Sequence, residues 1–383
     1  MERTTGRIAA VERPEGAART ERTHAGDYNI RMCRAADLPA VRLFIETYWK
    51  SRHILVLSST LMKWQHWNEQ RGDYNVVIAV HQMTGEIHGI LGFIPTRQFD
   101  PSISHIDVWL AIWTVRRDLQ VAGLGLALYS ALVNDMSPDS IMVLAVSQEV
   151  APLYRSLGFA LGTLNHYYMV NIEKRAFHLI GHFDGVYRSP LGISSAARSL
   201  IRYKKQTFDE QAASLSLAGA SHRRPAKSLR YLHNRYLEHP VYQYQLYGVV
   251  EGDTTLGLLV IRRVSHAGSS ALRVVDYYGE ADGLEGTFDA FQALLKESEA
   301  EYVDCYNYGL DEAIFADAGF IKRTPSAQVI IPNYFEPFEQ RNVDLEYAYK
   351  FSRGALPGAS PVWFFKGDSD QDRPNMLLEP LKA

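Results

Sequence analysis

The sequence predicts a mixed α/β fold, because strand-like runs alternate with helix-like ones along most of its length. Residues 108–115 (VWLAIWTV) form an apolar run rich in β-branched and aromatic residues, which predicts a buried strand. Gly123 and Gly125 then form a turn, and residues 126–133 (LALYSALV) have helical spacing. A second strand, glycine turn and helix occupy residues 272–295. Alternation of this kind indicates helices packed on β-sheets.

The other elements of the N-terminal half follow in a regular order. Alternating apolar and polar residues predict a strand at 28–34, and Pro39 indicates a helix start within 35–49. Gly85 lies in the turn of a predicted hairpin. The remaining predicted elements are a helix at 61–68, strands at 76–80, 87–94 and 141–146, a helix around Tyr154 and a strand at 166–170.

The composition indicates a protein with two ordinary hydrophobic cores. The chain has 383 residues, of which 46% are hydrophobic and 22% are charged, and this length exceeds what one core usually fills. The formal net charge of −3 gives no reason to expect nucleic acid or an anionic membrane as a partner. Cys33 and Cys305 are the only cysteines, so we expect neither a disulfide framework nor a structural metal site. No apolar run approaches the length of a transmembrane helix.

Residues 1–26 are rich in Arg, Glu, Thr, Ala and Gly and contain almost no large apolar side chains. This composition predicts a disordered tail. The tail lacks the apolar core of a secretion signal, so we expect the protein to reside in the cytoplasm.

The turn that follows residues 108–115 has the pattern Gln120-x-x-Gly123-x-Gly125. The first N–H groups of a helix have no partner within the helix, and its dipole places partial positive charge there, so such a turn can bind a phosphate or diphosphate. Glycines let an anion approach the backbone. The pattern is neither a dinucleotide fingerprint nor a nucleoside-triphosphate loop. An ordinary tight turn is the alternative interpretation.

A second motif follows this helix in the sequence. Residues 141–146 (IMVLAV) predict a short buried strand, and residues 153–159 (LYRSLGF) predict a helix that ends on a glycine. Together, the Gln-x-x-Gly-x-Gly turn and the Leu-Tyr-x-x-x-Gly-Phe segment resemble the GNAT acyltransferase superfamily over about residues 27–172. Ser147 and Val150 depart from the asparagine and alanine that are frequent in that pattern. The resemblance implies a mostly antiparallel twisted sheet flanked by helices.

The resemblance also implies that acetyl-coenzyme A, or another acyl-coenzyme A (acyl-CoA), binds at the glycine turn. The backbone around Thr114 would polarise the thioester carbonyl, and Tyr154 would donate a proton to the departing sulfur. A half-buried tyrosine with a satisfied hydroxyl is the alternative for Tyr154. The implied cofactor-binding residues are Thr114, Val115, Gln120, Val121, Ala122, Gly123, Leu124, Gly125, Leu126 and Ser147.

The general base has two candidates in the sequence. Many relatives carry a glutamate on the strand before the turn, but Trp109 stands at roughly that position and cannot accept a proton. Asp107 and His105 lie upstream on the same face of the strand and could act directly or through water. Each could instead mark the solvent end of the strand. An acceptor amine that is partly deprotonated would need no strong base.

The C-terminal half contains a degenerate copy of these motifs. Residues 281–286 (ADGLEG) stand in the place of the glycine turn, and residues 314–320 (IFADAGF) match the second motif. Such self-similarity predicts a duplicated domain. Asp282 and Glu285 would repel a diphosphate, and Phe315 replaces the tyrosine. We therefore expect tandem GNAT-like domains, of which the second no longer binds CoA.

The predicted organisation has five parts. They are a tail at 1–26, a GNAT acyl-CoA-binding domain at 27–172, a helical connector at 173–226, a degenerate GNAT-like domain at 227–366 and a C-terminal tail at 367–383.

Two segments of the second half bear on ligands. Residues 227–247 contain many tyrosines with Arg and His, which suits a sugar ring or nucleotide phosphate, although an amphipathic helix that ends before Pro240 is the simpler interpretation. The acidic run in residues 368–379 has calcium-loop spacing, but Arg373 and Pro374 disrupt it, so we expect no metal site.

These observations favour an acyl-CoA-dependent N-acyltransferase that acts on a small amine. Residues 331–338 (IPNYFEPF) and 366–375 (KGDSDQDRPN) resemble the tails of two-domain GNAT-like proteins associated with surface-glycan synthesis, which makes a nucleotide-linked amino sugar a candidate acceptor. The alternatives are a tRNA-dependent aminoacyl transferase like the Fem peptidoglycan enzymes, and a non-catalytic acyl-CoA sensor.

Overall fold

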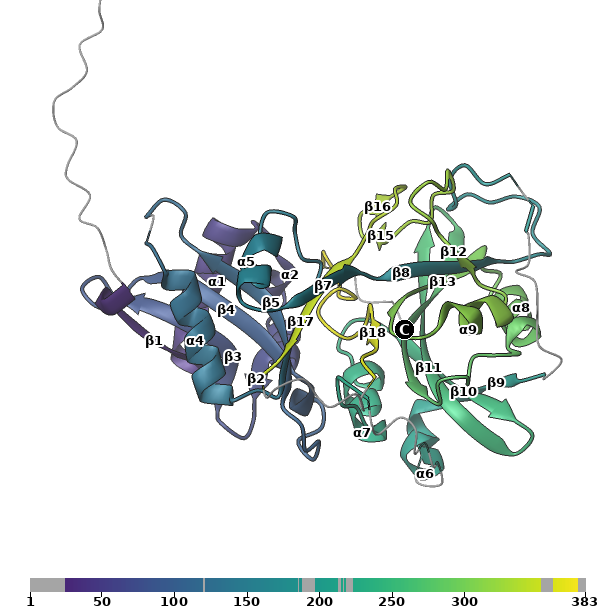
Figure 1. The fold of residues 1–383 in the computed structure, drawn as a ribbon, viewed down its shortest axis with the longest axis horizontal. Helices are drawn as coiled ribbons and strands as arrows, with labels where there is room; N and C mark the ends of the chain where they lie inside the picture. Colours follow the sequence, from purple (N-terminus) through teal and green to yellow (C-terminus); the bar gives the residue numbers. More distant parts are fainter. Residues whose placement is uncertain are drawn as a thin grey trace, which may run out of the picture.

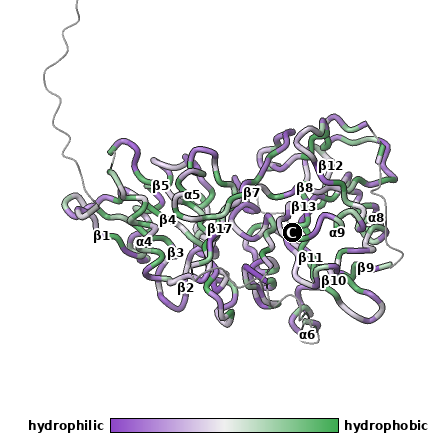
Figure 2. The backbone as a smooth tube through the Cα atoms, in the orientation of Figure 1, coloured by the Kyte–Doolittle hydropathy of each residue, from purple (hydrophilic) through white to green (hydrophobic). Residues whose placement is uncertain are grey.

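The chain forms two bodies, each built on an eight-stranded β-sheet, that lie side by side (Figure 1). In the computed structural model the described residues are 25–377, apart from 120, 185, 188–196, 213, 214, 216, 218–222 and 353–360. The predicted disorder of residues 1–26 therefore falls, except for the last two, outside the described part. Hydrophobic stretches follow the sheet strands of both bodies (Figure 2).

The first sheet has the strand order β1-β3-β4-β5-β6-β17-β7, with β2 paired to β3. Only β5 and β6 run parallel among its described pairs. Its strands are β1 Tyr28–Arg34, β2 Trp67–Asn68, β3 Asp73–His81, β4 Ile87–Pro95, β5 Asp107–Val115, β6 Ser140–Leu144, β7 Ala160–Thr163 and β17 Glu346–Phe351.

Helices cover both faces of the first sheet. On β3, Val77 and Ala79 pack against one set of helices and Val76 and Ile78 against the other, as the period of two in a strand requires. The set on one face is α4 Leu124–Met136 and α5 Ala151–Ser156, and the set on the other is α1 Leu38–Phe44, the π-helix Ile45–Trp49, α2 Ile54–Leu57 and α3 Ser59–His66. The helix predicted at 61–68 ends at His66, because Trp67 begins β2 and pairs with Tyr74 of β3.

The second sheet has the order β14-β8-β13-β12-β11-β10-β9, with β18 paired to β13. Its strands are β8 Asn165–Val170, β9 Ser199–Tyr203, β10 Tyr244–Glu251, β11 Thr254–His266, β12 Ser269–Gly279, β13 Tyr302–Tyr308, β14 Ile321–Lys322 and β18 Phe364–Phe365. The helices of this body are α6 Phe208–Ala212, α7 Leu229–Leu232, the π-helix η7 His233–Leu237, α8 Phe288–Glu297 and α9 Glu312–Asp317, and β15 Tyr334–Phe335 pairs with β16 Phe338–Glu339.

The two bodies exchange one strand each. β8 directly follows β7 in the chain, but it leaves the first sheet and pairs with β13 and β14 (Figure 1). β17, which comes after all the main strands of the second body, inserts between β6 and β7. Equivalent strands therefore occupy equivalent positions in the two sheets. Each sheet is complete only with one strand from the other half of the sequence.

The predicted mixed α/β fold with two helix-flanked, mostly antiparallel sheets is confirmed. The structure differs in where some segments go: β8 lies within 27–172 but joins the second sheet, and β17 lies within 227–366 but joins the first. Residues 173–226, expected to be helical, contain the strand β9 as well as α6. The predicted C-terminal tail begins with a buried segment, since Asp368 has no exposed surface. The five-part division itself stays a prediction about folding units.

No helix in the described part of the chain combines the length and apolar character needed to cross a membrane.

Candidate functional site

The first sheet opens into a cleft where β5 and β6 separate. The two strands pair in parallel only from Asp107 to Leu110 on β5 and from Ser140 to Val143 on β6. Beyond Leu110 a cavity of about 500 Å³ lies between the diverging strands. It is lined by the C-terminal part of β5, the residues that follow β6, the start of α4 and the helix α5.

The start of α4 offers unpaired backbone N–H groups to this cleft. Gly123 has a φ of +79° and precedes the helix, whose first internal bond runs from the Ala127 N–H to the Gly123 carbonyl. The amides of Leu124, Gly125 and Leu126 therefore have no partner within the helix. A Cβ atom on Gly123 would meet nothing within 4 Å, so the turn is open as well as electropositive.

Trp113 fixes the first turn of α4 against β5. Its Nε1 donates to the Gly125 carbonyl at 3.2 Å, and its ring stacks on Tyr129 of the same helix with 5.6 Å between centroids. The strand and the helix start are thus held together by side chains that come from both. This arrangement keeps the amide turn at the edge of the cleft.

Tyr154 of α5 lies in the same cleft. Its ring packs edge-to-face on Trp113 and on Phe159, with centroids 5.9 and 5.2 Å away. Tyr154 is 5% exposed, and burial raises the pKa of its phenol well above the usual value. The hydroxyl makes no hydrogen bond to any described residue, so it is free to donate to a ligand in the cleft.

The structure adds residues to this cleft that the sequence did not predict. Asp370, Gln371 and Arg373, from the C-terminal segment, form one wall of it. The Asp370 carboxylate accepts a hydrogen bond from Gln371 Nε2 at 3.0 Å and lies 3.1 Å from Arg373 Nη1. Asp370 belongs to the acidic run noted in the sequence. No local pattern indicates that this run lies beside cleft residues that come more than two hundred positions before it in the chain.

The second sheet holds this segment in place. β12 and β13 diverge just as β5 and β6 do, after three parallel pairs. Here the gap is filled: β18 pairs with β13, and the Gly367 N–H donates to the Val275 carbonyl of β12 at 2.8 Å. Phe364 and Phe365 are completely buried in it.

The predicted site residues fall into four groups. Those that line the cleft are Thr114, Val115, Gly125, Leu126, Ser147 and Tyr154, and those that form the turn at the start of α4 are Val121, Ala122, Gly123 and Leu124. Gln120 lies outside the described residues. The remaining two are the candidate bases.

Neither candidate base lies in the cleft. Asp107 has no exposed surface, and its carboxylate accepts hydrogen bonds from Arg224 Nε at 3.0 Å, Ala226 N at 2.6 Å and Ser140 Oγ at 2.5 Å. It sits where β5 and β6 are still paired, before the strands diverge. His105 precedes β5, is about half exposed and faces Asp139 at 3.7 Å. Asp107 is therefore held in a buried hydrogen-bond network, and His105 lies at the surface. This geometry favours neither residue as a base.

At the predicted degenerate copy, the gap between the strands is closed and the residue in place of Tyr154 has no hydroxyl. Phe315 is 1% exposed and stacks on Tyr167 with 3.9 Å between ring centroids. Gly286 keeps a positive φ of 66°, like Gly123, but the gap between β12 and β13 is occupied by β18. Within the described ranges, no cluster of three or more His, Cys, Asp or Glu side chains could hold a metal ion.

Comparison with known proteins identifies the fold. No protein-family profile and no curated protein sequence matches the chain. Among solved structures, a GCN5-related N-acetyltransferase from Anabaena variabilis has a TM-score of 0.51 at 12% identity, over 85% of this chain and 72% of that one. A GCN5-related N-acetyltransferase from Kribbella flavida gives 0.48 at 13%, over 86% and 72%. Saccharomyces cerevisiae N-myristoyltransferase with bound myristoyl-CoA gives 0.44 at 12%, over 91% and 84%. The chain has a GNAT fold, as its two motifs predicted.

We expect Asp107→Asn to lower the free energy of unfolding by about 3 kcal/mol, because it leaves the buried guanidinium of Arg224 without its negative partner. Denaturant unfolding measures this loss. Asp118→Asn, in an exposed pair with Arg116, is the matched control and should cost less than about 1 kcal/mol. A loss of turnover in Asp107→Asn with unchanged stability would instead support the role of Asp107 as a base.

Proposed function

We propose that this protein is an acyl-CoA-dependent N-acyltransferase that acts on a small amine. One observation carries the proposal: an open, electropositive amide turn and a buried tyrosine with a free hydroxyl face the same cleft of a GNAT fold. An anion-binding turn alone would support only the binding of a phosphate-containing ligand. A tyrosine alone would support no particular function. Their coincidence at a gap between two parallel strands supports group transfer.

The turn at the start of α4 is suited to the diphosphate of CoA. The amides of Leu124, Gly125 and Leu126 point out of the helix start, and the helix dipole adds partial positive charge. α4 is thirteen residues long, so its dipole is fully developed. The open space around Gly123 allows the diphosphate to approach the backbone.

The edge of β5 is suited to the thioester. β5 pairs with β4 up to Val115, but on the cleft side its pairing with β6 ends at Leu110. The backbone groups between Ala111 and Val115 that face the cleft therefore have no strand partner. An N–H of this edge can donate to the thioester carbonyl and stabilise the negative charge that develops on its oxygen.

Tyr154 serves as the donor to the leaving sulfur. Burial raises the pKa of its phenol, so the tyrosine keeps its proton while the substrate binds. As the carbon–sulfur bond breaks, the phenol donates a hydrogen bond that stabilises the negative charge on the sulfur. An ordinary thiol, with a pKa of about 8.5, is a stronger acid than the phenol, so the released thiolate takes its proton from solvent.

Asp370 serves as the base that receives the amine proton. It is the acid of the C-terminal segment that lines the cleft, and the sequence candidates Asp107 and His105 do not reach it. As the nitrogen–carbon bond forms, the Asp370 carboxylate takes the proton that the amine loses, directly or through water. Arg373 holds the carboxylate in position. The candidate acceptor class, a nucleotide-linked amino sugar, comes from the sequence resemblance and is part of this proposal.

We expect Gly123→Glu to weaken CoA binding by at least about tenfold, because the substitution places negative charge and bulk at the diphosphate site. Calorimetric titration with CoA measures this effect. Gly85→Glu is the control, since Gly85 also has a positive φ, 71°, with nothing within 4 Å of its Cβ position. Equal CoA affinity in wild type and Gly123→Glu would remove the turn from the binding site.

We expect Tyr154→Phe to lower kcat by about 100-fold while the Kd for acyl-CoA changes less than twofold, because only the hydrogen-bond donor is lost. Thiol release under saturating acyl-CoA measures kcat. Tyr129→Phe, which alters the other tyrosine that packs on Trp113, should keep wild-type turnover. Wild-type turnover in Tyr154→Phe would exclude it as the donor.

We expect Asp370→Asn to lower kcat by about 100-fold near neutral pH and to recover part of the loss as the pH rises, because a free amine needs no base. A pH–rate profile measures both effects. Glu149→Gln is the control, since Glu149 lines the same cleft. The assignment fails if Glu149→Gln shows the larger loss, or if the Asp370→Asn defect is independent of pH.

A further inference from the structure

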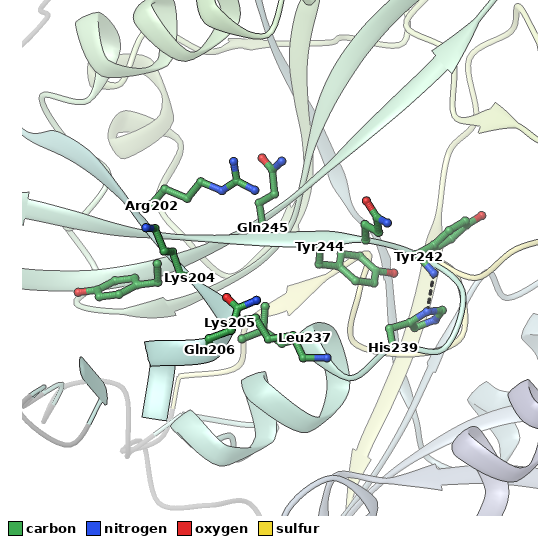
Figure 3. Close-up of a pocket in the computed structure, with 11 residues that line it drawn as sticks. Arg202, Lys204, Lys205, Gln206, Leu237, His239, Tyr242, Tyr244 and Gln245 are labelled. Carbon is green, nitrogen blue, oxygen red and sulfur yellow. Dashed lines mark hydrogen bonds between the residues drawn. The ribbon is translucent and has the colours of Figure 1, made fainter. Parts of the chain in front are cut away.

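A second, larger cavity lies in the second body, away from the acyl-transfer cleft. Its volume is about 710 Å³, which is within the range of sites for small organic ligands. It is bounded by the end of β9, the start of β10 and the residues that follow the π-helix η7 (Figure 3). The tyrosine-rich segment 227–247, which the sequence marked as a possible ligand site, contributes its C-terminal part.

The charge of this cavity is one-sided. Arg202, Lys204 and Lys205 line it, and none of its described lining residues is acidic. Lys205 is 3.0 Å from Glu238, outside the lining, which offsets one positive charge. Arg202 and Lys204 are exposed and form no ion pair with a described residue. Two uncompensated cations facing one cavity favour a ligand with two negative charges over a single carboxylate.

His239 adds a neutral donor. Its Nδ1 accepts hydrogen bonds from the backbone N–H groups of Val241 and Tyr242 at 3.1 and 2.8 Å. Burial lowers the pKa of the imidazole to about 3, so the ring is uncharged and carries its proton on Nε2. No described residue accepts a hydrogen bond from that Nε2. This N–H is therefore available to donate to a ligand in the cavity.

The two ends of the cavity therefore offer different chemistry. In Figure 3, Arg202 and Lys204 lie at one end and His239 and Tyr242 at the other. The hydroxyl of Tyr242 is already bonded to Glu336, so its ring, rather than its hydroxyl, faces a ligand. Gln206 and Gln243 supply exposed amides along the wall. An elongated ligand fits, with phosphate at the cationic end and a polar body reaching the histidine.

We propose that this cavity binds a small phosphorylated molecule, whose phosphate or diphosphate lies between Arg202 and Lys204 and whose polar body accepts a hydrogen bond from His239. The proposal does not depend on acyl transfer, because it concerns a different cavity on a different sheet.

The test is calorimetric titration of the full-length protein with uridine diphosphate and adenosine diphosphate, with uridine as the probe that lacks phosphate. CoA also carries phosphates, so the Gly123→Glu variant is titrated alongside the wild type to separate this cavity from the α4 turn. The charge-reversed variant is Arg202→Glu/Lys204→Glu. The matched control is Arg263→Glu/Lys63→Glu, which changes the net charge equally at two exposed positions outside the cavity. Thermal unfolding confirms that each variant is folded.

We expect at least one diphosphate to bind the wild type and Gly123→Glu equally, the control to stay within about twofold, and Arg202→Glu/Lys204→Glu to bind at least about tenfold more weakly. His239→Ala should weaken binding of the same probe. The proposal is overturned if neither diphosphate binds, if uridine binds as tightly as uridine diphosphate, or if Gly123→Glu removes the binding. It is also overturned if an RNA oligonucleotide binds through these cations while the diphosphates do not, since the surface would then serve a polymer. Failure here leaves the transfer cleft untouched, and failure of CoA binding leaves this cavity untouched.

Discussion

The exchange of strands between the two sheets is the constraint on which the rest of the molecule depends. β17 closes the first sheet by pairing with both β6 and β7, and β8 completes the second by pairing with β13 and β14. Each ladder joins residues that are far apart in the sequence, so the closure of these long loops must be offset by burial in both cores. Neither half of the chain can form its full sheet alone, and the two bodies are held in a fixed relation.

Buried ion pairs anchor the C-terminal segment on the second sheet, from which it extends to the cleft of the first. Lys227 contacts both Asp276 and Asp368, and Arg262 contacts Asp372 through two hydrogen bonds, all in the protein interior. Charges removed from water are stable only when their partners stay in place. The segment between these anchors is therefore rigid, and it presents Asp370 to the cleft of the first sheet. Tyr244, which lines the second cavity, donates to Asp372 and so connects that cavity to the same segment.

The two halves have used the same architecture differently. In the first, the gap between two parallel strands stays open and an amide turn borders it; in the second, β18 fills the equivalent gap. The filled gap holds β18, and the residues that follow β18 form one wall of the cleft in the first sheet. The second half thus contributes one wall to the cleft of the first, and it has a cationic cavity of its own.

The sequence by itself predicted most of the helices and strands, the glycine turn and the helix that carries Tyr154. Each of these depends mainly on residues that are close to it in the sequence. Strand 28–34 and the strand–turn–helix at Gly123 follow from periodicity and turn chemistry alone. The predicted bases failed to reach the cleft for a tertiary reason: Asp107 is bonded to Arg224, which no local pattern links to it. The strand exchange and the place of Asp370 were likewise decided only by folding. Which strand pairs with which, and which carboxylate meets which guanidinium, depends on surfaces that exist only once distant segments have packed together.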